Sequence, residues 1–358
     1  MAELPRLSKD EGPEYIMQPQ REKGGTFDAV SLLSGGLDGI LATRIVTDFG
    51  VRVLALHCVT PFFGHREGPD GDAFIRHMAD RYDFAVRIVD VTDAYMEMLT
   101  APEHGYGGNF NPCIDCKILM MRQARDVMEE VGGRFIVSGE VVGQRPMSQR
   151  KDAMRSIERD GGVEDILLRP LSAKLLSPTL PEREGWVDRE RLFDFSGRTR
   201  KPQMALAREL DVTEYPSPAG GCCLTDPIVS GRIRALFEES PRPNPGFIDL
   251  LRIGRPFRLP GGGILTVGRN QGENKTIESL AAFGDLFVKL KDMPGPLGII
   301  RGDRSWSDVR IAGSIVARYA RVKNDESAAV VSGEDIYDLK DEIQVSRARD
   351  EDISKMRF

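Results

Sequence analysis

Two adjacent glycines, Gly35 and Gly36, break an apolar run and lead into a stretch of helical pattern. The full segment reads Ser34-Gly35-Gly36-Leu37-Asp38-Gly39 and follows directly on the apolar residues 27–33. Glycines let a backbone approach a ligand closely, and the N–H groups of such a turn and of the following helix start face an anion. The segment therefore predicts a loop that binds nucleotide phosphates. The segment does not match G-x-x-x-x-G-K-[ST], which disfavours a Walker-type nucleoside triphosphatase. A Gly-Gly turn before a helix is also an ordinary strand-to-helix connection.

Short apolar runs alternate with stretches of helical periodicity in the first part of the chain. We expect strands at residues 27–33, 51–57, 84–89 and 135–137, and helices at residues 37–49, 73–82 and 114–131. This alternation is typical of an α/β domain with a doubly wound parallel sheet. Ligands bind to such sheets beyond the carboxyl ends of the strands. Four segments follow predicted strands and are expected at that edge: residues 34–39, Cys58, residues 139–144 and residues 169–171.

The 358 residues are enough for two or three domains. We expect an N-terminal extension over residues 1–26, the α/β domain over 27–230, a small α+β domain over 245–325 and a charged, partly disordered tail over 326–358. Residues 172–245 contain many prolines and are expected to be irregular. In the small domain we expect strands at residues 253–259, 263–267, 285–289 and 298–301 and a helix at 306–321.

The charge of the chain is uneven. The net charge is −6, yet the stretch from Arg252 to Lys323 holds thirteen basic and six acidic residues. This asymmetry predicts a nucleic-acid-binding appendage, although a solvated basic face would give the same count. The N-terminus does not read as a signal peptide, and no apolar run approaches the length of a membrane span.

Four of the five cysteines lie in two close pairs, which is typical of metal or sulfur chemistry in a reducing cytoplasm. Cys113 and Cys116 form a C-x-x-C turn before a predicted helix, where the helix dipole is expected to lower a thiol pKa. Cys222 and Cys223 follow two glycines. Adjacent side chains point in different directions, so we expect Cys222 rather than Cys223 to join the first pair.

Three thiolates suit a 4Fe-4S cluster with one iron left open, and we favour this interpretation for Cys113, Cys116 and Cys222. A structural zinc would need a fourth ligand. Cysteines that act as nucleophiles without a cluster are the third option. Cys58 follows a predicted strand alone and is expected to be a buried small hydrophobic residue.

Three motifs occur in the order of a known family. They are the Ser-Gly-Gly-Leu-Asp loop at residues 34–38, Cys-Lys-x-x-Met-Met at 116–121, and Gly-Glu-Val-Val-Gly-Gln at 139–144, with Arg-Pro-Leu at 169–171 as a further likeness. Together they resemble the tRNA 4-thiouridine synthase family of PP-loop ATP pyrophosphatases, an adenine nucleotide alpha hydrolase-like fold, in the form without a rhodanese domain. The likeness covers about residues 27–230. The related 2-thiouridylases share the loop and an Asn-Pro element with a cysteine, here at residues 111–113.

The chain also departs from this family. Gly39 stands where the family loop has a serine, and no THUMP-type RNA-binding segment is recognisable before the loop. The C-terminal block instead resembles the NFACT-type RNA-binding domain, through Val-Gly-Arg-Asn at 267–270, Glu273-Asn274 and Asp-Met-Pro-Gly at 292–295. That block would replace the missing RNA-binding module.

The resemblance implies a cytoplasmic enzyme that adenylates a uridine carbonyl of tRNA with ATP and Mg²⁺ and then replaces the oxygen with sulfur, 4-thiouridine being favoured. It implies a sulfur donor, either sulfide or sulfur from a cysteine desulfurase, no membrane, and a homodimer as one option. Asp38 would orient the metal ion, or serve only as a helix-start residue. ATP contacts are expected from Ser34, Gly35, Gly36, Leu37, Asp38, Gly39, Gly139 and Gln144, and catalysis from Asp38, Cys113, Cys116 and Cys222.

Several basic residues are candidates for phosphate contacts, with a solvated surface loop as the alternative: Lys117, Arg145, Arg150, Arg198, Arg200 and Lys201. The histidines form no spaced metal pair, and Trp186 and Trp306 are expected to be core or half-buried packing residues. Three other functions remain open: a tRNA 2-thiouridine synthase, a PP-loop sulfurtransferase or ligase for a small molecule, and a non-catalytic RNA-binding protein with a zinc-bearing core.

Overall fold

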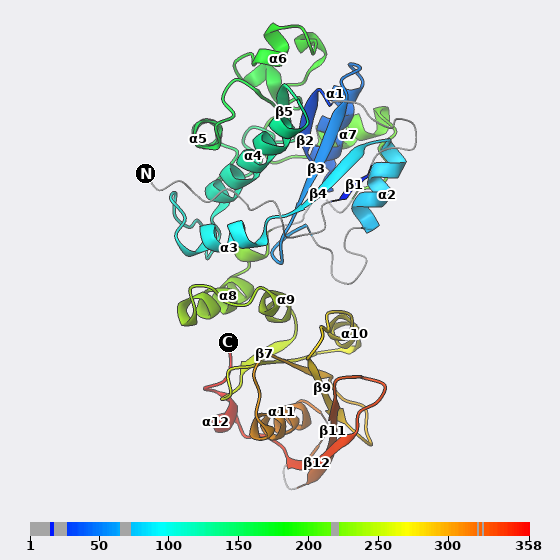
Figure 1. Ribbon diagram of the computed structural model, residues 1–358, viewed down its shortest axis with the longest axis vertical. Coiled ribbons are helices and arrows are strands. Elements are labelled where there is room, and N and C mark those ends of the chain that lie inside the picture. Colours follow the sequence, from blue (N-terminus) through cyan, green and yellow to red (C-terminus); the bar gives the residue numbers. More distant parts are fainter. Residues whose placement is uncertain (1–14, 18–26, 65–72, 216–221, 321, 324–325) are drawn as a thin grey trace. The chain divides into compact units, whose positions relative to one another are not determined.

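The computed structural model describes residues 15–17, 27–64, 73–215, 222–320, 322–323 and 326–358 (Figure 1). The described residues divide into two compact units, one up to Cys222 and the other from Cys223 onward. The N-terminal extension that we expected over residues 1–26 lies outside the described residues except for one short strand.

The first unit is built on a six-stranded sheet with the order β1-β4-β3-β2-β5-β6. The five strands from β4 to β6 are parallel, and β1 pairs with β4 antiparallel at the edge. The strands are β1 (Tyr15–Met17), β2 (Ala29–Leu32), β3 (Val53–Val59), β4 (Ala85–Asp90), β5 (Phe135–Ser138) and β6 (Leu167–Leu168). The predicted doubly wound parallel sheet is confirmed.

Helices cover both faces of this sheet. They are α1 (Leu37–Thr47), α2 (Ala73–Tyr82), α3 (Thr92–Thr100), α4 (Cys113–Glu130), α5 (Lys151–Gly161), α6 (Leu180–Arg183) and α7 (Lys201–Glu209). Successive strand residues point to opposite faces. Ala29 and Val53 therefore pack with α1, α2 and α7, whereas Val30 and Leu54 pack with α4 and α5.

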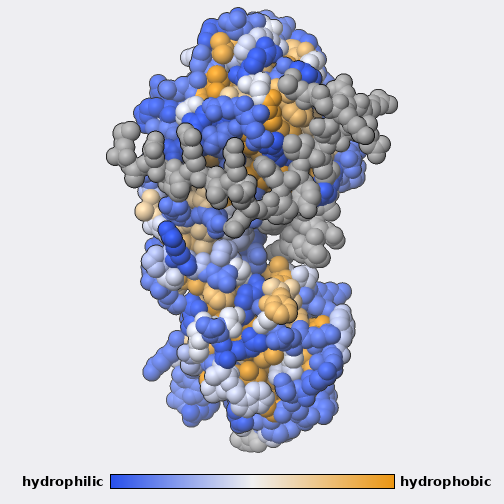
Figure 2. Space-filling view, in the orientation of Figure 1, coloured by the Kyte–Doolittle hydropathy of each residue, from blue (hydrophilic) through white to orange (hydrophobic). Residues whose placement is uncertain are grey.

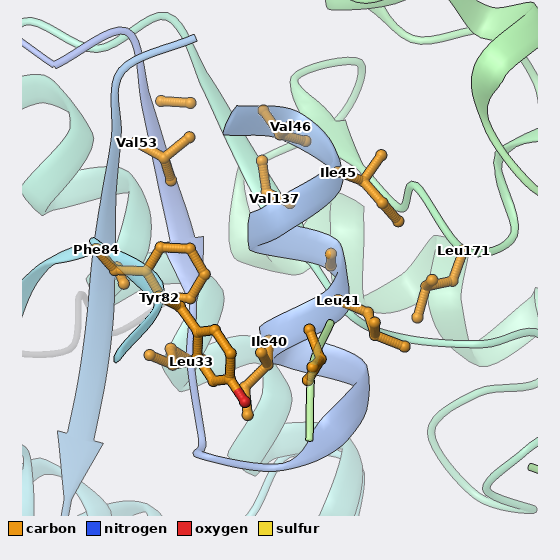
Figure 3. Packing of buried hydrophobic residues seen from close by; sticks show 14 of the residues in the cluster. Leu33, Ile40, Leu41, Ile45, Val46, Val53, Tyr82, Phe84, Val137 and Leu171 are labelled. Carbon is orange, nitrogen blue, oxygen red and sulfur yellow. The ribbon is translucent and has the colours of Figure 1, made fainter. Parts of the chain in front are cut away.

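The layer around α1 fixes the helix that follows the glycine loop. Figure 3 shows its buried side chains, which include Ile40, Leu41, Ile45, Val46, Val53, Phe84, Val137 and Leu171. Each fully buried aliphatic side chain contributes roughly 1.5–3 kcal/mol relative to an exposed one. The position of the loop is therefore set by a dry, close-packed interface.

The predicted strands and helices of the first unit match observed elements within two residues at most ends, but four helices were missed. Helices α6 and α7 occur within residues 172–245, which we expected to be irregular, and α3 and α5 occur in stretches for which we predicted no element. The basic residues Arg198, Arg200 and Lys201, for which a surface loop was one alternative, lead into α7, which begins at Lys201 with a proline in its first turn. Proline is common at that position because the missing N–H would be unsatisfied there anyway.

The second unit contains a six-stranded antiparallel sheet with the order β12-β11-β9-β10-β8-β7. Its strands are β7 (Arg255–Arg258), β8 (Ile264–Val267), β9 (Leu286–Leu290), β10 (Gly298–Arg301), β11 (Ser327–Gly333) and β12 (Asp341–Ser346). Its helices are α8 (Pro227–Glu239), α9 (Gly246–Arg252), α10 (Gln271–Ser279), α11 (Trp306–Arg318) and α12 (Asp350–Ile353). Helix α11 packs on one face of the sheet, and α9 and α10 pack on the other.

The charged tail expected over residues 326–358 is instead part of this sheet. Strand β11 pairs with β9 and with β12, and Val330, Ile343 and Val345 enter the core beneath α11. The alternation of these apolar residues with charged ones is the period of a half-buried strand, which the high charge content obscured. Residues 252–358 together hold eighteen basic and sixteen acidic residues, so the domain is nearly neutral.

The visible surface of each unit is mostly hydrophilic, with small groups of hydrophobic residues scattered among the hydrophilic ones (Figure 2). Trp186 is partly buried and stacks on Phe135, as expected. Trp306 does not fit the same prediction, because 54% of its surface is exposed at the start of α11. Among the residues that the structure describes, no helix combines the length and hydrophobicity needed to cross a bilayer.

Candidate nucleotide site and cysteine cluster

The glycine loop lies where the strand order of the sheet reverses. Strand β2 has β3 on one side and β5 on the other, so the loops after β2 and β5 leave the sheet in diverging directions and open a crevice. The loop after β2 is residues 34–39, and the loop after β5 contains Gly139 and Gln144. Gly35 has a φ of 76°, in the region that favours glycine, and Gly36 is the extended residue before α1. This backbone presents the first N–H groups of α1 at the crevice.

Gly139 is required by the approach of the two loops. A Cβ at this position would lie 2.4 Å from the carbonyl carbon and oxygen of Asp38 and 2.6 Å from the nitrogen of Gly39. Because these are backbone atoms, no side chain can rotate to make room. The predicted nucleotide-binding residues Gly139, Asp38 and Gly39 therefore lie against one another.

Asp38 is held by side chains from two other segments. Nε2 of Gln144 donates a 2.6 Å hydrogen bond to Oδ2 of Asp38, and Arg200 lies 3.8 Å from the same oxygen. Gln203 on α7 donates in turn to Oε1 of Gln144 at 2.8 Å. The other Asp38 oxygen, Oδ1, is buried with no hydrogen-bond partner in the structure. An orphaned buried carboxylate oxygen beside a phosphate loop fits a ligand of Mg²⁺, which prefers oxygen donors.

Lys117 connects the start of α4 to the loop after β5. Its Nζ lies 3.4 Å from Oε1 of Glu140, and Nε of Arg169 donates to Oε2 of the same carboxylate at 3.0 Å. Arg169 also pairs with Glu158. Burial alone would raise the pKa of Glu140, but Lys117 and Arg169 outweigh it and hold that pKa below its usual value. This buried network fixes the residue next to Gly139 and orients Lys117 toward the same edge of the sheet.

Three of the predicted cysteines lie close enough to influence one another. The pKa of the Cys116 thiol is raised to about 12 by burial and by the nearby thiols of Cys222 and Cys113, while Lys117 opposes the rise. The expectation that the helix dipole lowers the thiol pKa is therefore wrong for Cys116. The sulfur is surrounded by protein, although the residue keeps some exposed surface, and this desolvation exceeds the effect of the dipole. Tyr95 hydrogen-bonds to the same sulfur.

The remaining cysteines behave differently. The thiol of Cys113 donates to Oγ of Ser148 at 3.3 Å. Cys58 is buried in the core layer under α4, as predicted, and burial raises the pKa of its thiol to about 12. Cys223 opens a short 3₁₀ turn in the second unit. Residues 216–221, which include the glycines before Cys222, lie outside the described residues.

Cys113, Cys116 and Cys222 are soft thiol donors, none is in a disulfide, and the first and last both act on the titration of Cys116. Within the described ranges, however, no group of three or more His, Cys, Asp or Glu side chains is arranged to hold a metal ion. The three thiols therefore do not form a complete metal-binding site among the described residues.

The predicted basic residues divide into two groups. Lys117 and Arg200 contact buried or half-buried carboxylates at the site, as described above. Arg145, Arg198 and Lys201 are exposed, and Arg150 is an exposed partner of Asp152. Arg150 therefore fits the solvated-loop alternative.

Gln203 and Arg169 have structural roles at the site that the sequence did not reveal. Gln203 is fully buried and points its amide at Gln144, and Arg169 is buried beneath Glu140. A charged side chain directly after a predicted buried strand was the available signal for Arg169. No comparable signal marked Gln203, since it lies within a segment that reads as a basic turn.

Residues 24–174 match the family described as thiamine biosynthesis protein (ThiI), and residues 254–357 match the NFACT protein RNA binding domain. A tRNA-specific 2-thiouridylase MnmA from Nitratidesulfovibrio vulgaris is 31% identical over 112 residues, which cover 30% of this chain and 31% of that protein. A probable tRNA sulfurtransferase from Methanothermobacter thermautotrophicus is 32% identical over 116 residues, covering 32% and 29%.

The chain thus spans about a third of the length of the curated relatives that it matches. Among solved structures, a 4-thiouridine synthetase–RNA complex with bound ATP is similar at 19% identity, with 52% of each chain covered and a TM-score of 0.34. The two family matches cover the two units separately. The chain therefore combines a PP-loop ATP pyrophosphatase domain of the ThiI family with a C-terminal NFACT-type RNA-binding domain.

Proposed function

We propose that this protein is an ATP-dependent tRNA sulfurtransferase that replaces a carbonyl oxygen of uridine with sulfur. The observation that carries the proposal is the junction of Gly139 and Gln144 with Asp38 at the switch point of the parallel sheet. That junction belongs to a ThiI-family domain, and the same chain carries an RNA-binding domain. An ATP site and an RNA-binding module together suit a tRNA-modifying enzyme.

The first step is activation of the uridine. The carbonyl oxygen attacks the α-phosphorus of ATP, the bond to the bridging oxygen breaks, and pyrophosphate leaves. The N–H groups of residues 34–39 and of the start of α1 are suited to stabilising the charge that develops on pyrophosphate. Asp38 would hold Mg²⁺ through its unpartnered Oδ1, and the metal ion would neutralise phosphate charge when bound.

The second step exchanges the atoms. A sulfur nucleophile, from sulfide or from a cysteine desulfurase-derived donor, attacks the activated ring carbon. The carbon–oxygen bond then breaks, and AMP leaves with the original uridine oxygen. Lys117 contacts Glu140 in the loop after β5 and its charge acts on Cys116, so we assign it to stabilising the negative charge of the departing AMP or the thiolate of Cys116.

We assign Cys113, Cys116 and Cys222 to sulfur handling. Their donor chemistry suits a 4Fe-4S cluster, which when bound would supply sulfur at an iron that the protein leaves open. Without a cluster, Cys116 would carry persulfide sulfur delivered by a cysteine desulfurase, and its outer sulfur would attack the activated carbon as AMP leaves. Cys222, whose thiol acts on the titration of Cys116, would then attack Sγ of Cys116, which releases the thiouridine and leaves a Cys116–Cys222 disulfide that an external thiol must reduce. A cytoplasmic location and a homodimer stay predictions.

Two products remain candidates. The sequence motifs that resemble the 4-thiouridine synthase family favour 4-thiouridine, whereas the identity to a 2-thiouridylase supports 2-thiouridine. Chromatography of tRNA nucleosides with mass and absorbance detection separates the two isomers.

The test incubates protein purified without oxygen with unmodified tRNA, ATP, Mg²⁺ and sulfide, and measures AMP, pyrophosphate and thiolated nucleosides. We expect equal amounts of AMP and thiouridine, formed only with tRNA present. AMP formation that needs a small molecule instead of tRNA would indicate the small-molecule alternative. Zinc without iron, together with no pyrophosphate release, would indicate the non-catalytic RNA-binding protein.

Matched variants separate the roles. Asp38→Asn should abolish AMP formation, whereas Asp93→Asn, which removes the corresponding first-turn acid of α3, should leave it unchanged. Cys116→Ser and Cys222→Ser should stop thiolation, and Cys58→Ala should preserve it. Iron and sulfide analysis of each cysteine variant then distinguishes a cluster from free thiols.

A further inference from the structure

The second unit contains a pocket of about 360 Å³ that neither family match assigns. Its lining comes from α8, β7, the end of α11 and the last residues of the chain: Arg232, Arg255, Pro256, Phe257, Tyr319, Arg357 and Phe358. Binding pockets for small ligands usually measure roughly 300–1,000 Å³. The volume is therefore suited to a single nucleotide-sized group.

The pocket is strongly cationic within a domain that is nearly neutral. Three of its seven lining residues are arginines, and none of these described lining residues is acidic. Arg232 donates to the carbonyl oxygens of Leu251 and Gly254, which are neutral. Its pKa is lowered by burial and by the neighbouring charge of Arg269, although Asp226 and Glu273 act in the opposite direction. An anion in the pocket would relieve this crowding of positive charge.

The pocket also offers aromatic surface. The guanidinium of Arg255 lies 4.4 Å from the ring centre of Tyr319, and Arg357 donates to the Tyr319 hydroxyl at 3.3 Å. The ring centre of Phe257 lies 6.1 Å from that of Tyr319, and Phe358 completes the lining. Rings and guanidinium planes are the surfaces on which unpaired bases stack, and arginine forks match phosphate oxygens.

We propose that this pocket binds one unpaired nucleotide of the RNA substrate, with Arg255 and Arg357 on its phosphate and Tyr319 beside its base. The assignment rests on the proposed function for the choice of RNA over a free nucleotide. It makes the pocket a specific anchor in a domain whose overall charge is too balanced to attract RNA by itself. Outside the pocket, Arg301 and Lys291 each pair with an acid. In the pocket, Arg357 lies 3.7 Å from Asp350, an acid that it shares with Arg318, so its charge is only partly compensated.

The experiment measures binding of a fluorescent oligouridylate of about six nucleotides, within the usual site size of single-strand binders, to the full-length chain. Arg255→Gln/Arg357→Gln should weaken binding at least tenfold and reduce the slope of the salt dependence by about 0.7 for each phosphate that the variant no longer binds. Arg310→Gln/Arg349→Gln removes the same charge from exposed positions outside the pocket, and should change affinity less than twofold.

A second pair of variants tests stacking independently of charge. Tyr319→Leu should weaken binding about tenfold, in line with the loss of one base–aromatic stack, whereas Tyr319→Phe should retain binding. Circular dichroism and thermal unfolding confirm that each variant is folded. Equal losses in the pocket and control arginine variants, or no loss in the Leu variant, would overturn the proposal.

The last measurement compares the binding of uridine monophosphate with that of the oligomer. If the monophosphate binds as tightly as the oligomer and its binding is abolished in the same variants, the pocket takes a free nucleotide and the RNA assignment fails. Binding is read without turnover, so failure here leaves AMP formation and thiolation intact as separate tests of the proposed function.

Discussion

Gln144 donates a 2.6 Å hydrogen bond from Nε2 to Oδ2 of Asp38, across a sequence separation of 106 residues. The bond ties the loop after β5 to the glycine loop after β2, and Gln203 supports it from α7 at 2.8 Å. Asp38 is therefore oriented by a relay of two buried amides. The geometry of the candidate nucleotide site depends on this relay as well as on the loop itself.

Replacement of Gln144 by Leu tests the relay. The change removes the hydrogen bond to Asp38 and leaves the Gln203 amide buried without its partner, which is costly for buried polar groups. We expect kcat/KM for AMP formation to fall about 100-fold, the scale of a small misplacement of a positioned group. Gln123→Leu on α4 is the control and should retain activity. Normal activity in Gln144→Leu would show that the relay is dispensable.

Replacement of Gly139 by Ala tests the contact between the two loops. The new methyl group would lie 2.4 Å from the Asp38 backbone, so the glycine loop must move. Overpacking of this kind costs about 1–3 kcal/mol, and we expect ATP affinity measured by calorimetry to drop at least tenfold. Gly108→Ala is the control, because a Cβ at Gly108 meets nothing within 4 Å. Equal ATP affinity in the two variants would contradict the assignment.

Replacement of Glu140 by Gln tests the buried charge network. Removal of one partner leaves Arg169 and Lys117 with less compensation, and breaking a buried pair costs about 3–5 kcal/mol. Each unit contains one tryptophan, so a Trp306→Phe background lets Trp186 fluorescence report urea unfolding of the first unit alone. The exposed Glu129→Gln should change stability by less than about 0.5 kcal/mol. A similarly small effect of Glu140→Gln would argue against the network.

Replacement of Asp308 by Asn tests a helix cap through its pH dependence. Burial alone would raise the pKa of Asp308, but hydrogen bonds from Ser305 and from the Gly261 N–H outweigh it and hold that pKa below 3.8. A lowered folded-state pKa stabilises the fold above the unfolded value, and that stability is lost as the pH falls through the folded value.

We therefore expect the Asn variant to be about 1 kcal/mol less stable at pH 7, with the difference shrinking below about pH 4. A Trp186→Phe background leaves Trp306 as the reporter of the second unit. A difference between the two proteins that is constant from pH 7 to pH 3 would exclude this role for Asp308.

Much of the first unit could be predicted because its signals are local. The apolar run before Gly35 and the alternation of strands and helices give the parallel sheet, and the sheet class places residues 34–39 and 139–144 at one edge. The motif at residues 267–274 could also be recognised in the second unit, but two of its side chains stabilise the local fold. Asn270 caps α10, and Asn274 accepts a hydrogen bond from the Leu297 N–H.

The remaining features depend on contacts that a single sequence does not reveal. The raised pKa of Cys116 follows from the protein that surrounds its sulfur, whereas the helix dipole visible in the sequence suggests the opposite. The pocket in the second unit brings together Arg232, Arg255 and Arg357, and the first and last of these are more than a hundred residues apart in the sequence. The charge count over residues 252–323 predicted a nucleic-acid-binding appendage, whereas acidic residues of 326–358 and ion pairs such as Arg301–Asp285 offset most of that charge in the folded domain.

The pairing of β11 with β9 has a practical consequence for anyone who shortens this protein. A chain that stops before residue 326 would leave the outer hydrogen-bonding groups of β9 unpaired and uncover the apolar side chains beneath α11. Such bare strand edges recruit other strands. Truncated versions should therefore aggregate. Weaker RNA binding by such versions would then reflect self-association and not the loss of a binding surface.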